Sequence, residues 1–118
     1  MPDSITETLT ISGQPTVADI SQLPAQGFKV LINLRPDHEE GALGNRVERE
    51  AAQEAGLAYH FIPVTMASIT EADVEAFRAA TAGQGPVFAH CRTGARALTL
   101  HVLSQVLDGK MRACELPA

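Results

Sequence analysis

The stretch GPVFAHCRTGARA, residues 85–97, decides how the sequence is interpreted, because it joins a strand, a loop and a helix. Its apolar part, PVFAH (86–90), is typical of a strand, and the residues from 95 onward have the spacing of a helix. Cys91 lies between the two. In open α/β sheets, ligands bind beyond the carboxyl ends of the strands. The stretch therefore predicts an α/β sheet with a functional loop at the end of one strand.

Short β-rich runs and helical patterns alternate along the whole chain. The predicted strands are 8–11, 28–34, 59–64 and 86–90, and the predicted helices begin at Thr16 and span 45–56, 70–82 and about 95–107. Thr16 and Thr70 each stand three residues before an Asp, as in a capping box, Asn45 is a candidate cap, and Gly56 suits a helix end. This order predicts one α/β domain over residues 1–118, with a central, mostly parallel sheet of four or five strands flanked by helices.

The last two helices have apolar residues at helical spacing, which predicts the faces that they bury. The expected buried residues are Val74, Phe77 and Thr81 in the first, and Leu98, Val102 and Val106 in the second, which Asp108 and Gly109 should end.

The composition excludes several classes of protein. The net charge is -5 and no run of Lys or Arg offsets it, which argues against nucleic acid or an anionic membrane as partner. No stretch reaches the ~18 apolar residues of a spanning helix and the N-terminus does not resemble a signal peptide, so a cytoplasmic location is the default. Two cysteines and four scattered histidines lack metal-ligand spacing, so no metal or other cofactor is expected.

The loop after the last predicted strand has the chemistry of an anion cradle. Cys91 lies at a helix N-terminus and beside two arginines, which together favour the thiolate. Gly94 lets the backbone turn its N–H groups inward, and Arg96 can close the cradle with its planar fork. We therefore predict Cys91 and Arg96 as catalytic residues, with an anion-binding loop of Arg92, Thr93, Gly94 and Ala95.

Three further residues near the predicted edge have two interpretations each. His90 either shapes the loop by hydrogen bonding or is a core residue of its strand. Arg35 either recruits an anionic substrate or forms a surface salt bridge with Asp37. Asp37 is also a candidate acid that can reach the site from the loop after the second strand.

The remaining charged residues and the second cysteine are assigned no part in the site. Glu39, Glu40 and the glutamates of 48–54 are expected to be solvated charge. Cys114 is either a resolving thiol or incidental.

Several segments resemble one bacterial family. HCRTGARA (90–97) is similar to the active-site loop of cysteine-dependent phosphatases and rhodaneses. With it, the chain resembles the phosphatase-like domain of beta-lactamase hydrolase-like proteins (DUF442) through ISGQPTVADI (11–20), GFKVLINLRPDHEE (27–40), AGLAYHFIPV (55–64) and ITEADVEAF (69–77). The resemblance implies the α/β fold of dual-specificity phosphatases. Family members also occur fused to metallo-hydrolase domains of the persulfide-dioxygenase kind, which implies sulfur metabolism and a persulfide-handling partner.

Two departures from the phosphatase pattern bear on the reaction. Phosphatases resemble Cys-x5-Arg, whereas four residues separate Cys91 from Arg96 here, as in the short loops of rhodaneses. Where phosphatases of this fold place an acidic Asp, residues 65–68 read TMAS, without a carboxylate. General acid catalysis is worth about 10²–10⁴-fold, whereas sulfur transfer between thiolates needs no acid.

The departures favour one reaction but leave three functions open. The first is a sulfurtransferase that carries a persulfide on Cys91 and takes a small anionic sulfur donor. The second is a phosphatase that hydrolyses phosphotyrosine or a small phosphate ester through a phosphocysteine. The third is a non-catalytic module for anion binding or partner docking.

Overall fold

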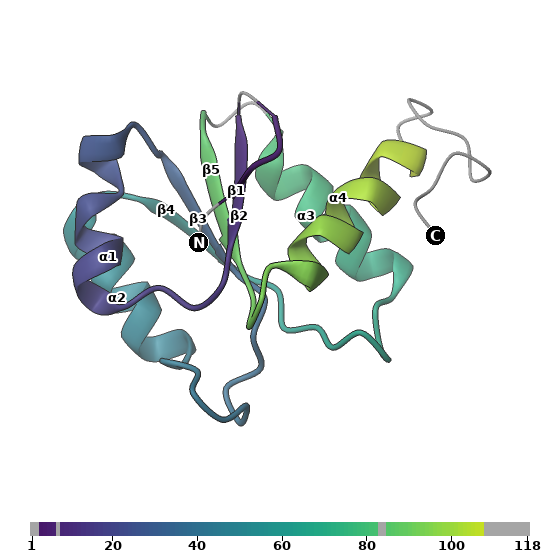
Figure 1. The fold of residues 1–118 in the computed structure, drawn as a ribbon, viewed down its shortest axis with the longest axis horizontal. Coiled ribbons are helices and arrows are strands. Elements are labelled where there is room, and N and C mark those ends of the chain that lie inside the picture. The colour runs from purple at the N-terminus through teal and green to yellow at the C-terminus, as the bar shows by residue number, and fades with distance from the viewer. Residues whose placement is uncertain (1–2, 7, 83–84, 108–118) are drawn as a thin grey trace.

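The computed structural model describes residues 3–6, 8–82 and 85–107, which form one sheet with helices on both faces (Figure 1). The strands are β1 (Asp3–Ser4), β2 (Leu9–Ser12), β3 (Val30–Asn33), β4 (Ala58–Phe61) and β5 (Val87–His90). The helices are α1 (Val17–Gln22), α2 (Asn45–Ala55), α3 (Glu71–Thr81) and α4 (Ala95–Leu107), with a 3-10 turn at Pro24–Gln26. The predicted α/β architecture is confirmed.

The sheet places β5 at its centre. The strand order is β1-β2-β5-β3-β4, and β2, β5, β3 and β4 run parallel. The short β1, which the sequence did not predict, pairs antiparallel with β2 at one edge. Every residue of β5 is buried, as in a strand covered on both faces. The loop that carries Cys91 therefore leaves the middle of the sheet.

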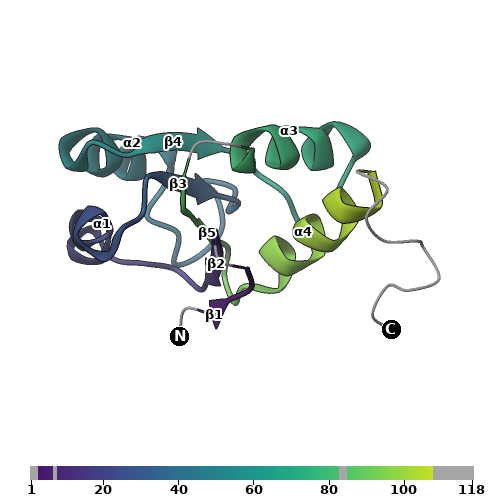
Figure 2. The same cartoon turned by 90° about the horizontal axis from the view of Figure 1, so that it is seen from above.

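Two helix pairs cover the two faces of the sheet, α1 with α2 and α3 with α4 (Figure 2). Side chains of β5 alternate between the two cores, as a strand requires. Val87, Ala89 and Cys91 belong to the core under α3 and α4, and Phe88 belongs to the core under α1 and α2. His90 faces the same side as Phe88, so the histidine and the cysteine lie on opposite faces.

The predicted helix starts at Thr16 and Thr70 are confirmed. The Thr16 hydroxyl accepts from the Asp19 N–H at 3.0 Å, and the Asp19 carboxylate accepts from the Thr16 N–H at 2.9 Å. Thr70 and Asp73 form the same capping box. Gly56 ends α2 as predicted.

The cap expected at Asn45 is wrong by one residue. Gly44 occupies the N-cap, and Asn45 is the first residue of α2. The reason is an acceptor from elsewhere in the chain, because Asp37 Oδ1 accepts from the Asn45 N–H at 2.6 Å. The Asp37 side chain, from the preceding loop, therefore caps the N-terminus of α2 in place of the predicted Asn45 side chain.

The buried face of α4 also differs from the prediction. Leu98 is 39% exposed, whereas Ala97, Leu100 and Ser104 are buried. Apolar residues surround α4, so the period alone does not select a face, and the turn after Cys91 sets the rotation of the helix. In α3, the prediction is confirmed for Val74 and Phe77, with Ala80 buried in place of Thr81.

The predicted end of the last helix at Asp108 and Gly109 lies outside the described residues, as does Cys114. Within the described ranges, no helix combines the length and the apolar character needed to cross a membrane.

Candidate active site

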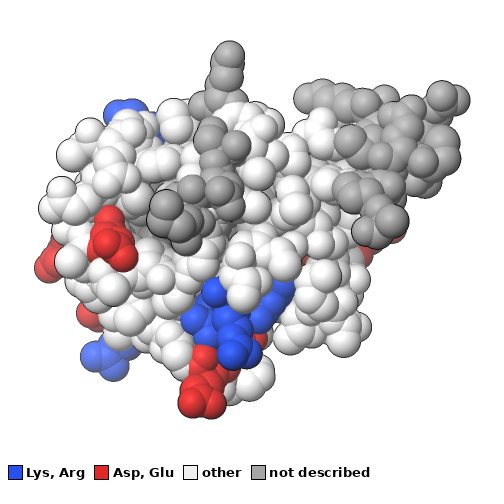
Figure 3. Space-filling view, viewed as in Figure 1, with Lys and Arg blue, Asp and Glu red and all other residues white. Residues whose placement is uncertain are grey.

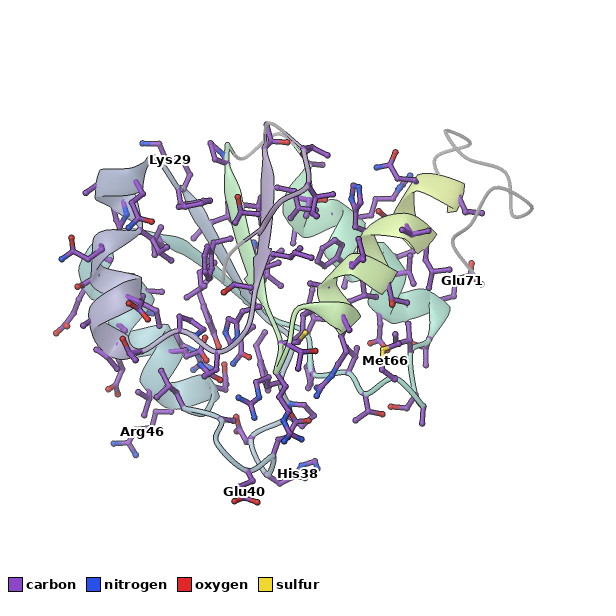
Figure 4. The ribbon with its side chains drawn as sticks, viewed as in Figure 1. Lys29, His38, Glu40, Arg46, Met66 and Glu71 are labelled. Atoms are coloured by element: carbon purple, nitrogen blue, oxygen red, sulfur yellow. The ribbon has the colours of Figure 1, made fainter. Side chains whose placement is uncertain are left out.

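Three loops meet at the carboxyl edge of the parallel strands, at the lower end of the sheet in Figure 1. They follow β2, β3 and β5, and the third carries Cys91. Figure 4 shows His38 and Glu40 at the tip of the loop after β3, and Met66 on the connection after β4. Figure 3 shows basic side chains gathered at this edge, with acidic side chains directly beside them.

Cys91 is buried at the start of its loop. Its side chain has no exposed surface, and its N–H donates to the Ser12 carbonyl at 3.2 Å. The Gly94 N–H donates to the Cys91 Sγ at 3.0 Å. Gly94 has a φ of 93°, a value that glycine adopts without the strain of a side chain. The turn thus aims one backbone donor at the sulfur, just before α4 begins.

The loop after β2 presses closely against the cysteine loop. A Cβ atom on Gly13 would lie 3.0 Å from the Arg92 carbonyl oxygen, closer than side chains ordinarily approach. Glycine therefore permits this contact. The outer residues of the cysteine loop, Arg92, Thr93 and Ala95, are exposed.

Arg96 closes the loop but is not free. Its Nη1 donates to the Val64 carbonyl at 2.9 Å, and its Nη2 donates to Glu39 Oε1 at 2.9 Å. The side chain is 12% exposed. The guanidinium therefore ties the start of α4 to the loops after β3 and β4.

Glu39 is the counter-ion of two arginines, which corrects its prediction as solvated charge. Its Oε1 accepts from Arg96 Nη2 and from Arg35 Nε, each at 2.9 Å. The hydrogen bond from Arg96 holds the pKa of this carboxyl below its ordinary value of 4.5, against the effect of burial and with further help from Arg35. Glu39 is therefore a carboxylate at neutral pH.

Arg35 is an internal cross-link, so the predicted surface salt bridge with Asp37 is wrong, whereas the recruitment of an anionic substrate stays a prediction. Its side chain is 3% exposed, so it forms no surface salt bridge. Besides Glu39, it donates to Gln14 Oε1 at 3.0 Å and to the Glu40 carbonyl at 2.6 Å. Asp37, its predicted partner and a candidate acid, instead accepts from the first N–H of α2.

His90 is a buried residue of β5 and is paired with Glu48. The His90 Nε2 and Glu48 Oε1 lie 2.6 Å apart, and neither side chain has any exposed surface. Glu48 was also predicted as solvated charge, which is wrong. One signal in the sequence points to its burial, since Glu48 shares a helical face with the buried Ala51 and Ala52.

No carboxylate stands on the connection after β4. The Thr65 and Ser68 hydroxyls bond to each other at 2.7 Å, and the Ser68 N–H donates to the Thr65 carbonyl. A cleft of about 440 Å³ opens beside this turn, with Pro36, Asp37, His38, Phe61, Pro63, Val64, Thr65 and Ser68 along its walls. Among the described residues, no three His, Cys, Asp or Glu side chains lie close enough together to hold a metal ion.

A cysteine after the central parallel strand, with a loop N–H on its sulfur and an arginine closing the loop, defines an α/β domain of the cysteine-phosphatase type. The chain belongs to the family of the phosphatase-like domain of beta-lactamase hydrolase-like proteins, whose sequence profile matches residues 3–108. The predicted resemblance is confirmed. This family is phosphatase-like and the chain has the cysteine-phosphatase fold, which agrees with the prediction of a cysteine-dependent enzyme.

Individual relatives agree with this assignment. The chain is 54% identical over 114 residues to the beta-lactamase hydrolase-like protein of Agrobacterium fabrum, covering 95% of this chain but only 26% of that protein. A DUF442 protein of Shewanella putrefaciens CN-32, designated a candidate phosphatase, superposes with a TM-score of 0.81 at 32% identity, over 92% of this chain and 69% of that one. The core catalytic domain of the PP-IP phosphatase SIW14 of S. cerevisiae has a TM-score of 0.60 at 14% identity, over 97% and 80%, a likeness of fold alone.

Proposed function

We propose that this domain is a cysteine-dependent sulfurtransferase that carries a persulfide on Cys91. The observation that carries the proposal is the pairing of Arg96, whose two terminal nitrogens are bonded to the Val64 carbonyl and to the carboxylate of Glu39. A phosphate dianion needs uncompensated positive charge and several donors around its oxygens. A single sulfur atom needs less, and the short loop offers one N–H to the sulfur of Cys91.

The described carboxylates and hydroxyls around the Cys91 loop are poorly suited to act as a general acid, which supports the same reaction. Departure of an alkoxide from a phosphate ester needs a proton. The polar side chains of the turn at 65–68 are the hydroxyls of Thr65 and Ser68, and neither is an acid at neutral pH. The lowered pKa of Glu39 leaves this carboxylate without a proton to give. Asp37 is engaged by the N-terminus of α2. Sulfur transfer avoids the difficulty, because its leaving group departs as an anion that is stable in water.

The proposed reaction has two displacement steps at sulfur. The Cys91 thiolate attacks the outer sulfur of thiosulfate, the S–S bond of thiosulfate breaks, and sulfite leaves with the electron pair. A nucleophile such as cyanide then attacks the outer sulfur of the persulfide and leaves as thiocyanate. The thiolate is restored, and no external oxidant or reductant is needed.

The test is the intact mass of the protein after incubation with thiosulfate. We expect a gain of about 32 Da, one sulfur atom, that maps to Cys91 and disappears on addition of cyanide. Cys91→Ser should gain nothing. Thiocyanate formation by Cys91→Ser at the wild-type rate would refute the proposed nucleophile.

Arg96 and Arg92 offer a matched pair of substitutions. Arg96→Lys keeps the charge but loses the planar fork that spans Val64 and Glu39, so persulfide formation should slow about tenfold or more. Arg92→Lys makes the same change at an exposed position of the same loop and should have a small effect. Equal rates in the two variants would mean that the geometry of Arg96 is unimportant.

A phosphatase is the second candidate, favoured by the phosphatase-like family and by the cleft beside Val64. Phe61 and Pro63 in its wall suit an aryl ester, whose good leaving group needs little acid. Turnover of phosphotyrosine peptides or p-nitrophenyl phosphate without any mass gain from thiosulfate would establish this reaction, through a phosphocysteine, in place of sulfur transfer. Failure of both assays would leave a non-catalytic anion-binding or docking module.

A further inference from the structure

We propose that Glu48 is a positioning residue that determines which ring nitrogen of His90 carries the proton, and thereby the geometry at the start of the Cys91 loop. The inference deepens the proposed function, because it rests on Cys91 as the nucleophile. It concerns a ring proton, however, which can be measured without any turnover.

Glu48 lies where a carboxylate is costly. It belongs to the first turns of α2, on the face that packs toward the sheet with Ala51 and Ala52, and no part of its side chain is exposed. A buried carboxylate is tolerated only when its oxygens are bonded, and apolar residues often replace a buried ion pair without loss of stability. Packing alone therefore does not account for a glutamate at this position.

Both oxygens of Glu48 accept hydrogen bonds. Oε1 is 2.6 Å from His90 Nε2, and Oε2 accepts from Gln14 Nε2 at 3.1 Å. In the proposed arrangement Glu48 is the ionised partner, and because a carboxylate can only accept, the proton of the first contact belongs to His90 Nε2.

The direction of the second contact is fixed by the other bonds of Gln14. Its Nε2 also donates to the Pro15 carbonyl at 2.9 Å, and its Oε1 accepts from Arg35 Nη1 at 3.0 Å. Arg35 has only donors. If the Gln14 amide were flipped, its NH₂ group would face the Arg35 Nη1 donor, so the amide is held in the observed orientation. Hydrogen bonds therefore run in one direction from Arg35 through Gln14 to Glu48.

The second nitrogen of His90 is left without a partner. Nδ1 is buried and has no hydrogen bond among the described residues. A buried N–H without an acceptor is costly, so Nδ1 is best explained as the unprotonated nitrogen of a neutral ring. Nδ1 is also the ring nitrogen fewer bonds from the main chain, so a proton moved from Nε2 to Nδ1 lies closer to the start of the Cys91 loop.

The network reaches both ends of the cysteine loop. Main-chain bonds hold its start, from the Leu34 N–H to the His90 carbonyl at 3.0 Å and from the Cys91 N–H to the Ser12 carbonyl at 3.2 Å. Side chains continue from there to the arginine that closes the loop, in the order His90, Glu48, Gln14, Arg35, Glu39 and Arg96.

Glu48→Gln tests the proposal with almost no change in shape. Because Gln14 presents a donor, the new amide must turn its oxygen to Gln14 and its NH₂ group to His90 Nε2. That ring nitrogen must then accept, so the ring proton moves to Nδ1. We expect wild-type His90 to be protonated at Nε2 alone at pH 8, and Glu48→Gln to be protonated at Nδ1 alone.

Two measurements follow the change. NMR of protein labelled with ¹⁵N and ¹³C in histidine identifies the protonated nitrogen, and the rate of iodoacetamide addition to the Cys91 peptide reports the loop. Addition should slow about tenfold in Glu48→Gln, the lower end of what the loss of an outer hydrogen-bond partner costs at metal-ligating histidines. Glu50→Gln, the same change at an exposed position of α2, should match the wild type in both measurements.

A second pair of variants applies if Glu48→Gln does not fold. His90→Gln retains an N–H donor that can reach Glu48, whereas the shorter His90→Asn does not. Cys91 in His90→Gln should react at close to the wild-type rate, and in His90→Asn much more slowly. Equal rates would overturn the proposal.

Three further results would overturn it: wild-type His90 protonated at Nδ1 or at both nitrogens, an unchanged ring in Glu48→Gln, or a moved proton with no effect on Cys91. The proposed function fails by a different result, since retained activity in Cys91→Ser refutes the nucleophile and leaves the ring proton unaffected.

Discussion

Substitution of Glu39 by Gln should destabilise the domain, because this carboxylate lies between two arginines. Glu39 Oε1 accepts 2.9 Å hydrogen bonds from Arg35 and Arg96, which are 3% and 12% exposed. Removing one partner of a fully buried ion pair costs about 3–5 kcal/mol, and a solvent-exposed pair contributes about 0–1 kcal/mol. Glu39 is 20% exposed, so an intermediate loss of about 2–3 kcal/mol in the free energy of unfolding is expected.

Urea denaturation measures this loss, and Glu40→Gln is the matched control. Glu40 is exposed and bonds Arg35 through its main-chain carbonyl, which the substitution keeps. Glu40→Gln should therefore unfold at the wild-type urea concentration. An unchanged midpoint in Glu39→Gln would refute the reasoning, since it would mean that the two arginines need no counter-ion.

The same carboxylate should give the wild type a characteristic pH dependence. The pKa of Glu39 is lower in the folded state than its ordinary value of 4.5, so the unfolded chain binds the proton more tightly. The stability from Glu39 is then fully present above pH 4.5 and is lost as the pH falls through the folded pKa. Glu39→Gln should lose less stability than the wild type over that acid range.

Four other substitutions test separate parts of the fold. Leu100→Ala should cost about 2–5 kcal/mol in urea denaturation and Leu98→Ala under about 0.5 kcal/mol, because only Leu100 is buried in the core. Gly94→Ala should cost about 1–2 kcal/mol from its left-handed backbone and slow iodoacetamide addition to Cys91, whose sulfur the Gly94 N–H contacts. Thr70→Ala should lower the free energy of unfolding by about 1 kcal/mol through the lost cap, with the Cys91 rate unchanged.

The sequence by itself determined the order of the elements and the place of the cysteine. Capping boxes at Thr16 and Thr70 involve residues three apart, so local pattern is enough to find them. The apolar run before Cys91 predicts a buried strand in the same way. The loop from Cys91 to Arg96, at the carboxyl end of that strand, could therefore be predicted from a short window.

Tertiary structure alone decided which charges are buried and what they contact. Glu48 meets His90 across 42 positions, and Glu39 meets Arg96 across 57. A glutamate in a polar helix or loop is usually solvated, and only the packing of a distant partner makes its burial favourable. The buried face of α4 could not be predicted for a related reason. Apolar residues lie all round this helix, so several rotations about its axis bury apolar side chains, and the structure adopts one of them. Chain-distant contacts set the electrostatics of the site, because charge pairing depends on distance in space and not on separation in the sequence.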